Sequence, residues 1–182
     1  MQIHELTDAE RELMVDELFK KLNIKRRHPS REELEKEVID YLEKKHPCTL
    51  ATSSRDGVPR VSVVDYVNEG LFIYIFSEGG GKFKNLLENN RVAVGIGTST
   101  QTIKSVRGVN ITGRADVFTE DAPEFAHAMK LFKPLFDDFE KQTGSPVVFP
   151  PCMVRVIRVT PMSIIYYHYM KGIAFATWEA SS

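Results

Sequence analysis

From Cys48 onwards the sequence is a series of short apolar, β-branched runs separated by turn residues, and this pattern restricts the fold most. The runs "CTLATSS" and "VPRVSVVDYV" are joined by "RDG", a hairpin signal, and "NEG" leads into "LFIYIFS". "RVAVGIG" and "VRGVNITGRADVF" follow, and Gly108 and Gly113 in the last run predict a bulge or a sharp bend. We therefore expect five strands here, linked mainly by hairpins.

A single helix is expected late in this series of strands. The acidic start "EDAPEF" predicts a helix over about residues 121–141, with a kink at Pro134. Its apolar face is formed by Phe125, Met129, Phe132 and Phe136. "CMVRVIRVT" and "SIIYYHYM" predict two further strands, which makes about seven. Many antiparallel strands with one inserted helix favour a mainly β fold with flanking helices, a small β-barrel, over a doubly wound sheet.

Two capping boxes predict two helices before the first strand. Thr7 with Glu10 and Ser30 with Glu33 match the S/T-x-x-E pattern, and Pro47 closes the second helix. The apolar residues at helical spacing are Leu13, Leu18 and Leu22, then Leu34, Val38 and Leu42. The basic linker "KKLNIKRRHPS" between them is interpreted as a solvated connection. No flexible linker follows, so we expect one domain over 1–182, with a helical extension over 1–46 and the barrel over 48–170.

Composition and spacing exclude several classes of function. The net charge of −1 gives no electrostatic reason to expect nucleic acid, and no apolar run is long enough for a membrane span. The first residues, "MQIHELTDAERELMVDEL", lack a signal-peptide pattern, so a cytoplasmic protein is expected. Cys48 and Cys152 are too few for a disulfide framework and are interpreted as buried thiols. The five histidines, at positions 4, 28, 46, 127 and 168, lack metal-ligand spacing, so no metal site is expected.

The sequence also contains a glycine cluster between two strand-like runs. Gly79, Gly80 and Gly81 precede Lys82 and the short helical run "KFKNLLENN". Bare glycines let backbone N–H groups approach an anion, and the lysine adds a positive charge. This combination suggests a phosphate site, whereas glycine clusters between strands are also common as plain turns. From the residues of the loop alone, the plain turn is the favoured interpretation.

Taken in order, three segments resemble the FMN-binding split β-barrel family typified by pyridoxamine 5′-phosphate oxidase. They are "TLATSSRDGVPRVSVVDYV", "LFIYIFSEGGGKFKNLLENNRVAVGI" and "VRGVNITGRADVF", which cover roughly residues 48–118. The shared features are a first hairpin with a D-G turn, a lysine-bearing loop with "NL", and a G-x-A strand. The resemblance implies a Greek-key-like split barrel with FMN as its cofactor.

The resemblance also implies which residues hold the cofactor. Arg60 and Lys82 would contact the FMN phosphate in the loop that contains Gly81, and Ser77 would donate its hydroxyl to a phosphate or ribityl oxygen. The backbone of Val61, Ser62 and Val63 would follow the edge of the flavin ring. Strand alternation separates two faces of the second run: Arg60, Ser62, Val64 and Tyr66 on one, and Val61, Val63, Asp65 and Val67 on the other.

Three departures from the type enzyme bear on the substrate. Gly81 stands where an arginine usually precedes the lysine, Gly108 lies where a glutamine is expected, and Asp65 replaces a lysine. The C-terminal run "YYHYMKGIAFATWEASS" lacks both the R-x-H and the W-x-x-x-R-L-x-P signatures for pyridoxal phosphate. Oxidation of pyridoxamine phosphate is therefore not expected.

Three functions remain open at this point. The first is an FMN-dependent oxidoreductase acting on a small substrate, with NAD(P)H or a redox partner as the electron source. The second is a non-catalytic flavin-binding or flavin-sensing protein, and the third is a relative that binds F420 or heme. The family implies a homodimer with flavin sites at the interface. His168 is interpreted as part of a packed strand rather than a lid over the flavin, and Trp178 as surface packing near a mobile terminus.

Overall fold

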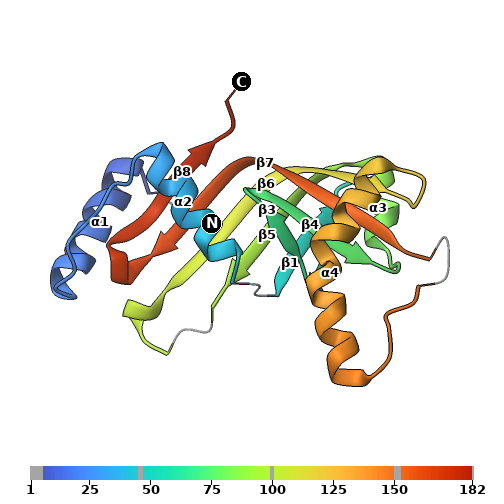
Figure 1. Ribbon diagram of the computed structural model, residues 1–182. Coiled ribbons are helices and arrows are strands. Elements are labelled where there is room, and N and C mark those ends of the chain that lie inside the picture. Colours follow the sequence, from blue (N-terminus) through green and yellow to red (C-terminus); the bar gives the residue numbers. More distant parts are fainter. Residues whose placement is uncertain (1–5, 45–46, 99–100, 150–152, 182) are drawn as a thin grey trace.

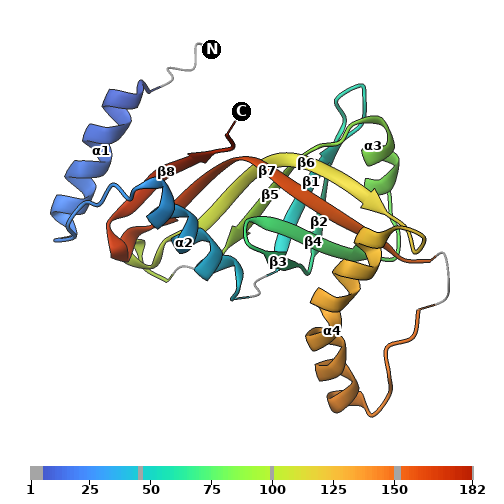
Figure 2. The same cartoon turned by 45° about the horizontal axis from the view of Figure 1, so that its top comes forward.

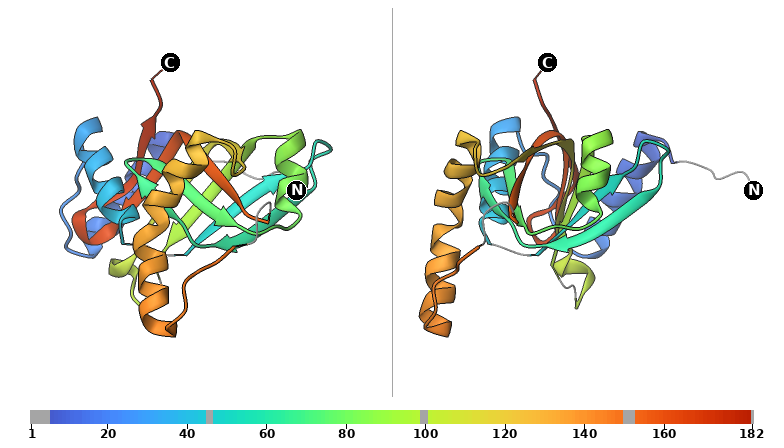
Figure 3. Two further views of the ribbon diagram at one scale, coloured as in Figure 1. Left: turned by 45° about the vertical axis from the view of Figure 1, so that its right-hand side comes forward. Right: turned by 90° about the vertical axis from the view of Figure 1, so that its right-hand side faces the viewer.

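The strand-like runs form one antiparallel sheet of eight strands in the computed structural model, which describes residues 6–44, 47–98, 101–149 and 153–181 (Figure 1). The strands are β1 (Cys48–Ser53), β2 (Pro59–Val64), β3 (Val67–Glu69), β4 (Phe72–Ser77), β5 (Arg91–Gly97), β6 (Arg107–Phe118), β7 (Arg155–His168) and β8 (Ile173–Glu179). Their order is β2-β1-β5-β6-β7-β4-β3, and β8 also pairs with β7. The sheet is curled into a half-barrel, and the right-hand view of Figure 3 looks into it from one end.

Strand β7 produces the split in the barrel because two strands share one of its edges. Residues 155–159 pair with β4, and residues 163–168 pair with β8, while β6 pairs along nearly the whole of the other edge. The β6–β7 register shifts between Thr112 and Gly113, and a Cβ at Gly113 would lie 2.4 Å from the carbonyl oxygen of Thr160. The bulge predicted at Gly113 is therefore confirmed, and its cause is close contact between two backbones.

The α-helices in the described part of the chain are α1 (Asp8–Lys21), α2 (Arg31–Leu42), α3 (Lys82–Glu88) and α4 (Pro123–Thr143). Both predicted capping boxes are present, at Thr7 with Glu10 and at Ser30 with Glu33. The helix α4 lies against β3, β4 and β7 outside the sheet and runs through Pro134 (Figure 2). None of the described helices is long and apolar enough to cross a membrane.

The main core fills the curled sheet and includes one side of α2. Leu34, Val38 and Leu42 are buried there, as the sequence predicted, and Cys48 is 1% exposed. Burial raises the pKa of the Cys48 thiol to about 12, with a smaller effect from the charge of Asp65. This thiol is buried as predicted, whereas Cys152 lies outside the described residues. Because α2 supplies part of the core, it is more than a peripheral extension.

Two smaller clusters attach α4 and α1 to the sheet. The side of α4 that carries Ala128 and Phe132 packs on Tyr74 and Val156. On α1 the buried residues are Val15 and Phe19, while Leu13 is 67% exposed. The prediction that Leu13 belongs to the apolar face of the first helix was therefore wrong.

Four further predictions about the fold need correction. The two runs predicted as separate strands before residue 170 form the continuous β7, because a bulge accommodates Pro161 opposite Gly113. The single run "VPRVSVVDYV" divides into β2 and β3. The sheet extends beyond residue 170, since β8 was not predicted. Trp178 lies in β8 and not near a mobile terminus: its ring packs on the main core and its Nε1 donates to Glu35.

The basic linker is also packed rather than solvated. The side chain of Arg26 is 13% exposed, and the backbone N–H of Arg27 donates to the carbonyl oxygen of Gly172 over 2.9 Å. A Cβ at Gly172, whose φ is +72°, would lie 1.9 Å from the carbonyl oxygen of Lys25. The linker is thus fixed against the β7–β8 turn by backbone contacts that its composition did not indicate.

Candidate functional site

The glycine loop connects β4 to α3 and passes close to an arginine from another strand. Gly80 adopts a φ of +103°, which favours glycine, and no heavy atom lies within 4 Å of a Cβ built at Gly79. A Cβ at Gly81 would lie 2.6 Å from Cζ of Arg60. The guanidinium of Arg60 therefore occupies the space that a side chain at position 81 would need.

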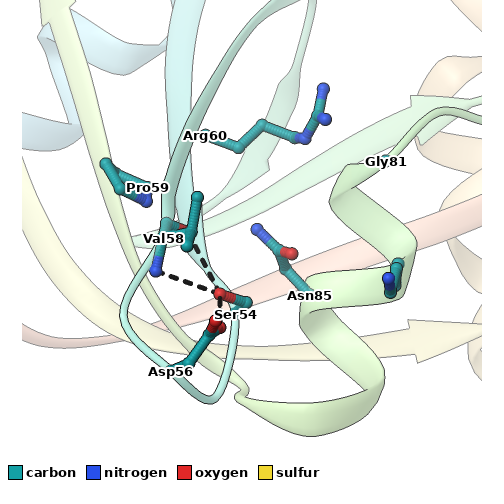
Figure 4. A pocket seen from close by; sticks show the side chains of 8 residues that line it. Ser54, Asp56, Val58, Pro59, Arg60, Gly81 and Asn85 are labelled. Carbon is teal, nitrogen blue, oxygen red and sulfur yellow. Dashed lines mark hydrogen bonds between the residues drawn. The ribbon is translucent and has the colours of Figure 1, made fainter.

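Arg60 reaches the loop from β2, at the end of the sheet (Figure 4). The strand β2 thus supplies a guanidinium beside Gly81, where the loop itself has no side chain. Among the described residues, no carboxylate forms an ion pair with Arg60. The positive charge of Arg60 is consequently uncompensated.

Lys82 places a second positive charge beneath the same loop. Its residue is 8% exposed, and its Nζ donates to the carbonyl oxygen of Gly79 over 2.6 Å. Burial lowers the pKa of Lys82, and the charge of Arg60 lowers it further. In the described part of the chain no acidic group pairs with Lys82. Two neighbouring cations that lack an acidic partner favour the binding of an anion.

Ser77, at the end of β4, also faces this loop. Its Oγ donates to the carbonyl oxygen of Gly79 over 3.3 Å, and the residue is 9% exposed. Ser77 and Lys82 thus share one acceptor under the loop. The structure brings Arg60, Ser77, Gly81 and Lys82 together around the loop.

A hollow of about 300 Å³ opens beside Arg60 and Gly81 (Figure 4). We call it the Arg60 hollow; it is lined by Ser54, Asp56, Val58, Pro59, Arg60, Gly81, Lys84 and Asn85. Its acidic residue, Asp56, accepts a hydrogen bond from Ser54, and this contact lowers the pKa of the exposed Asp56 carboxyl. The charge of Lys84 lowers that pKa as well, although it is a smaller cause.

The helix α3 supplies two lining residues of this hollow that were not predicted as site residues. Lys84 is exposed and follows Lys82 at a K-x-K spacing, which was visible in the sequence. Asn85 is 7% exposed, and its Nδ2 donates to Oγ1 of the buried Thr52 over 3.2 Å. This contact fixes α3 against β1, so Asn85 presents a held amide to the hollow.

Val61, Ser62 and Val63 lie on the terminal strand of the sheet. Among the described strands β2 pairs only with β1, so the backbone groups on its other edge have no strand partner. The side chains of Val61 and Val63 are 64% and 74% exposed, whereas Val64 packs against the core. The two predicted faces are correct up to Val64, where β2 ends, so the alternation does not continue to Tyr66 and Val67, which are both buried.

A broad depression crosses the outer face of the sheet next to Val63. Its volume is about 450 Å³, and its floor includes Gly95, Gly97 and Gly108, with Tyr167 at one side. Glycines on adjacent strands leave this face flat. A planar group or a second protein surface fits such a floor better than a narrow ligand does.

The described histidines do not lie at the Arg60 hollow. His168 is 15% exposed, and its Nδ1 lies 3.4 Å from the hydroxyl of Tyr166. Burial lowers the pKa of His168 to about 4, and the positive charges of Arg107 and Lys171 contribute. His168 is thus a packed residue of β7, while His4 and His46 lie outside the described residues. Within the described ranges, no group of three or more His, Cys, Asp and Glu could hold a metal ion.

At the level of sequence, the chain matches a family model and a relative from another organism. The family model described as pyridoxamine 5′-phosphate oxidase matches residues 34–168. A UPF0306 protein from Pasteurella multocida (strain Pm70) is 31% identical over 99 residues, which are 53% of this chain and 66% of that protein. The chain therefore spans slightly less than two thirds of the curated relative that it matches.

Solved structures with the same fold have diverse descriptions. A conserved hypothetical protein from Mycobacterium tuberculosis aligns with a TM-score of 0.59 and 22% identity, over 81% of this chain and 91% of its own. A candidate pyridoxamine 5′-phosphate oxidase from Listeria innocua gives 0.57 and 20%, over 75% and 99%. A heme storage protein from Vibrio cholerae gives 0.56 and 16%, over 70% and 89%. At these identities the likeness establishes the split-barrel fold alone.

Proposed function

The chain belongs to the pyridoxamine 5′-phosphate oxidase family, and from that premise we propose that it is an FMN-binding oxidoreductase. Its substrate is a small molecule, and its electrons come from NAD(P)H or a redox partner. The observation that carries the proposal is the pair of uncompensated cations, Arg60 and Lys82, around the glycine loop. The phosphate of FMN carries close to two negative charges, which matches this pair.

The residues at the phosphate end fit the group that they would hold. Arg60 offers a planar fork and Lys82 a point charge, and the bare glycines leave the backbone accessible between them. The helix α3 has only seven residues, so the attraction rests on the side-chain charges and not on the helix. An arriving phosphate would compete with the carbonyl oxygen of Gly79 for Lys82 and Ser77.

Strand β2 would hold the ring end of FMN. Along Val61, Ser62 and Val63, alternate residues point their backbone N–H and C=O groups away from β1, and these groups suit the donors and acceptors of the pyrimidine part of a flavin. When bound, the flavin supplies the hydride chemistry, and the protein supplies orientation and exclusion of water. The residue that would assist hydride acceptance is not assigned.

A second copy of the chain would cover the ring side. The exposed Val61 and Val63 and the glycine floor beside them form an apolar surface that another protomer would shield from water. We propose a homodimer with one flavin site at each end of this interface. Sedimentation equilibrium checks this: a monomer at micromolar concentration, with flavin bound, would contradict it.

The first experiment is an absorption spectrum of purified protein before and after FMN is added and the excess removed. We expect a retained two-band flavin spectrum. In Lys82→Met we expect the dissociation constant for FMN to rise about 10- to 100-fold, because a hydrogen bond to a charged group contributes about 1.5–3 kcal/mol. The matched control is Lys133→Met, since Lys133 is 69% exposed and already paired with Asp137 on α4.

The other possible outcomes of this experiment distinguish between the alternative functions. Unchanged FMN affinity in Lys82→Met would show that the glycine loop is a plain turn. A Soret band would favour heme, and retention of F420 instead of FMN would favour a deazaflavin relative. Bound FMN without turnover of NADH or NADPH, or of a reduced redox partner, would favour a non-catalytic flavin protein.

A further inference from the structure

A second hollow lies on the other side of the glycine loop. We call it the Arg155 hollow; it has a volume of about 250 Å³ and is lined by Gly79, Gly80, Phe83, Leu87, Val117 and Arg155. Along α3, Phe83 and Leu87 are one turn apart, whereas Lys84 and Asn85 belong to the Arg60 hollow. The glycine loop therefore separates two hollows that open on different faces of the same short helix.

Arg155 brings a third uncompensated positive charge to this loop. It is the first residue of β7, and it pairs in register with Ser77 at the end of β4. Its Cζ lies 5.1 Å from the centre of the Phe83 ring. Across the described ranges of the chain, no carboxylate forms an ion pair with Arg155. Arg155 is held by the aromatic ring and not by an acidic group, so its charge is available to an anion.

The three cations follow one another across the loop. Arg60 contacts Gly81, Lys82 lies beneath Gly79 and Gly80, and Arg155 lies in the second hollow. The Nζ of Lys82 is 5.3 Å from the centre of the same Phe83 ring. Arg60 and Arg155 line different hollows, so a single phosphate in the Arg60 hollow leaves Arg155 without an anion. A row of three suits two linked phosphates that cross the bare glycines.

The remaining lining of the Arg155 hollow is apolar and open to solvent. Leu87 is 88% exposed and Val117 is 37% exposed, while the ring of Phe83 is partly covered. An apolar surface with an aromatic ring and a nearby arginine favours the stacking of a planar base. Covering an exposed leucine at the rim of such a hollow removes apolar surface from water, which favours binding of the ligand.

We propose that the Arg155 hollow binds the adenylate half of a flavin dinucleotide whose FMN half occupies the site along β2. This inference rests on the proposed function and extends the cofactor past its first phosphate. The Arg60 hollow takes the phosphate next to the ribityl chain, Arg155 takes the second phosphate, and Phe83, Leu87 and Val117 cover the base. The flavin would then be FAD, with FMN bound as its weaker fragment.

The test compares FMN and FAD on the full chain by isothermal titration calorimetry. We expect FAD to bind at least about tenfold more tightly than FMN, which corresponds to about 1.4 kcal/mol. In Arg155→Met, most of that advantage should be lost while the affinity for FMN stays unchanged. The matched control is Arg158→Met, because Arg158 lies on the same strand and already pairs with Asp116. It should leave both affinities unchanged.

A second variant guards against a change of fold at β7. Leu87→Glu alters an exposed side chain and places a carboxylate beside the proposed second phosphate, so it should weaken FAD but not FMN. Equal affinities of the wild type for FMN and FAD would overturn the inference and leave the proposed function intact. Arg155-dependent binding of NADH to FMN-loaded protein would also overturn it, by assigning the hollow to the electron donor. If neither flavin binds, the proposed function fails together with the inference.

Discussion

Two regions of this protein are rich in arginine and lysine, and they lie at opposite ends of the sheet (Figures 1 and 2). At the end that carries α1, α2 and β8, Arg26 pairs with Glu12 and Asp16, at 2.9 Å and 3.6 Å. At the other end, around the glycine loop, Arg60 and Lys82 lack an acidic partner among the described residues. In the first region, which we call the paired region, basic side chains form ion pairs with carboxylates. The loop region, in contrast, has an excess of positive charge.

A single carboxylate illustrates how thoroughly the paired region is neutralised. Glu37 is 12% exposed; Arg27 lies 3.8 Å from it, Lys171 2.7 Å and His168 4.0 Å. The pKa of His168 is nevertheless lowered to about 4, so His168 is neutral near pH 7 and adds no charge there. These contacts tie the linker, α2 and the β7–β8 turn to one another.

The density of basic residues in a sequence therefore does not indicate where an anion binds. The run "KKLNIKRRHPS" is the more basic segment, yet its buried Arg26 forms an ion pair with Glu12 that holds the linker against α1. The glycine loop has fewer cations, but among the described residues they lack acidic partners, and Lys82 is buried. A bound anion would therefore stabilise these charges more than it would stabilise charges that are already paired. Compensation by neighbouring acids, and not composition, separates the two regions.

The largest loss of stability should come from disrupting the backbone contact between the linker and Gly172 in the paired region. Gly172→Ala would add a strained left-handed conformation, about 1–2 kcal/mol, to a clash with the carbonyl oxygen of Lys25. We expect a loss of more than about 3 kcal/mol in the free energy of unfolding, measured with urea. Gly144→Ala is the matched control, because its φ of +69° is similar and its Cβ would meet nothing within 4 Å. Equal losses in the two variants would mean that the linker is not held at Gly172.

An exchange of one arginine in each region should separate stability from binding. Arg26→Met should lower the free energy of unfolding by about 1–2 kcal/mol, since it removes charged hydrogen bonds and a cation–π contact with Phe19. Its flavin affinity should not change. Arg60→Met should leave stability unchanged and weaken FMN about 10- to 100-fold. Chemical denaturation and FMN titration of both variants decide this, and a stability loss in Arg60→Met would contradict the contrast.

The smallest effect should come from moving the Arg60 guanidinium without removing it. In Gly81→Ala the new Cβ must displace the far end of Arg60, a flexible side chain, so the fold should tolerate it. We expect FMN affinity to fall about three- to tenfold, which is less than about 1.4 kcal/mol. Gly144→Ala, at the end of α4, meets no atom within 4 Å, and it should bind FMN as the wild type does. Equal FMN affinity in both variants would show that the fit between Arg60 and Gly81 does not matter.

Much of the fold was predictable because its signals are local. Two capping boxes, the D-G hairpin turn and the bulge at Gly113 were correct, since each depends on residues close in sequence. β8 was missed because its run has no clear alternation and includes Phe175, which adopts a φ of +52°. Its pairing with β7 is a tertiary contact, and so is the packing of Trp178 that follows from it.

The candidate site was predictable only in part. Arg60, Ser77, Gly81 and Lys82 were selected through the family resemblance, and the structure brings them to one loop. Asn85 was not selected, because its held position depends on the buried Thr52 of β1. Arg155 was not selected either, since its neighbours Ser77 and Phe83 are distant in the sequence.

Most of the strand-forming runs, two helix starts, the bare glycine loop and the family resemblance of these segments could be recognised without the structure. Each of these depends on conformational preferences and spacings that operate over a few residues. Only the tertiary structure decided which positive charges would be neutralised, because an ion pair requires two side chains to meet within about 4 Å. The helices α1 and α2 bring carboxylates to Arg26 and Arg27, whereas within the described residues none pairs with Arg60, Lys82 or Arg155.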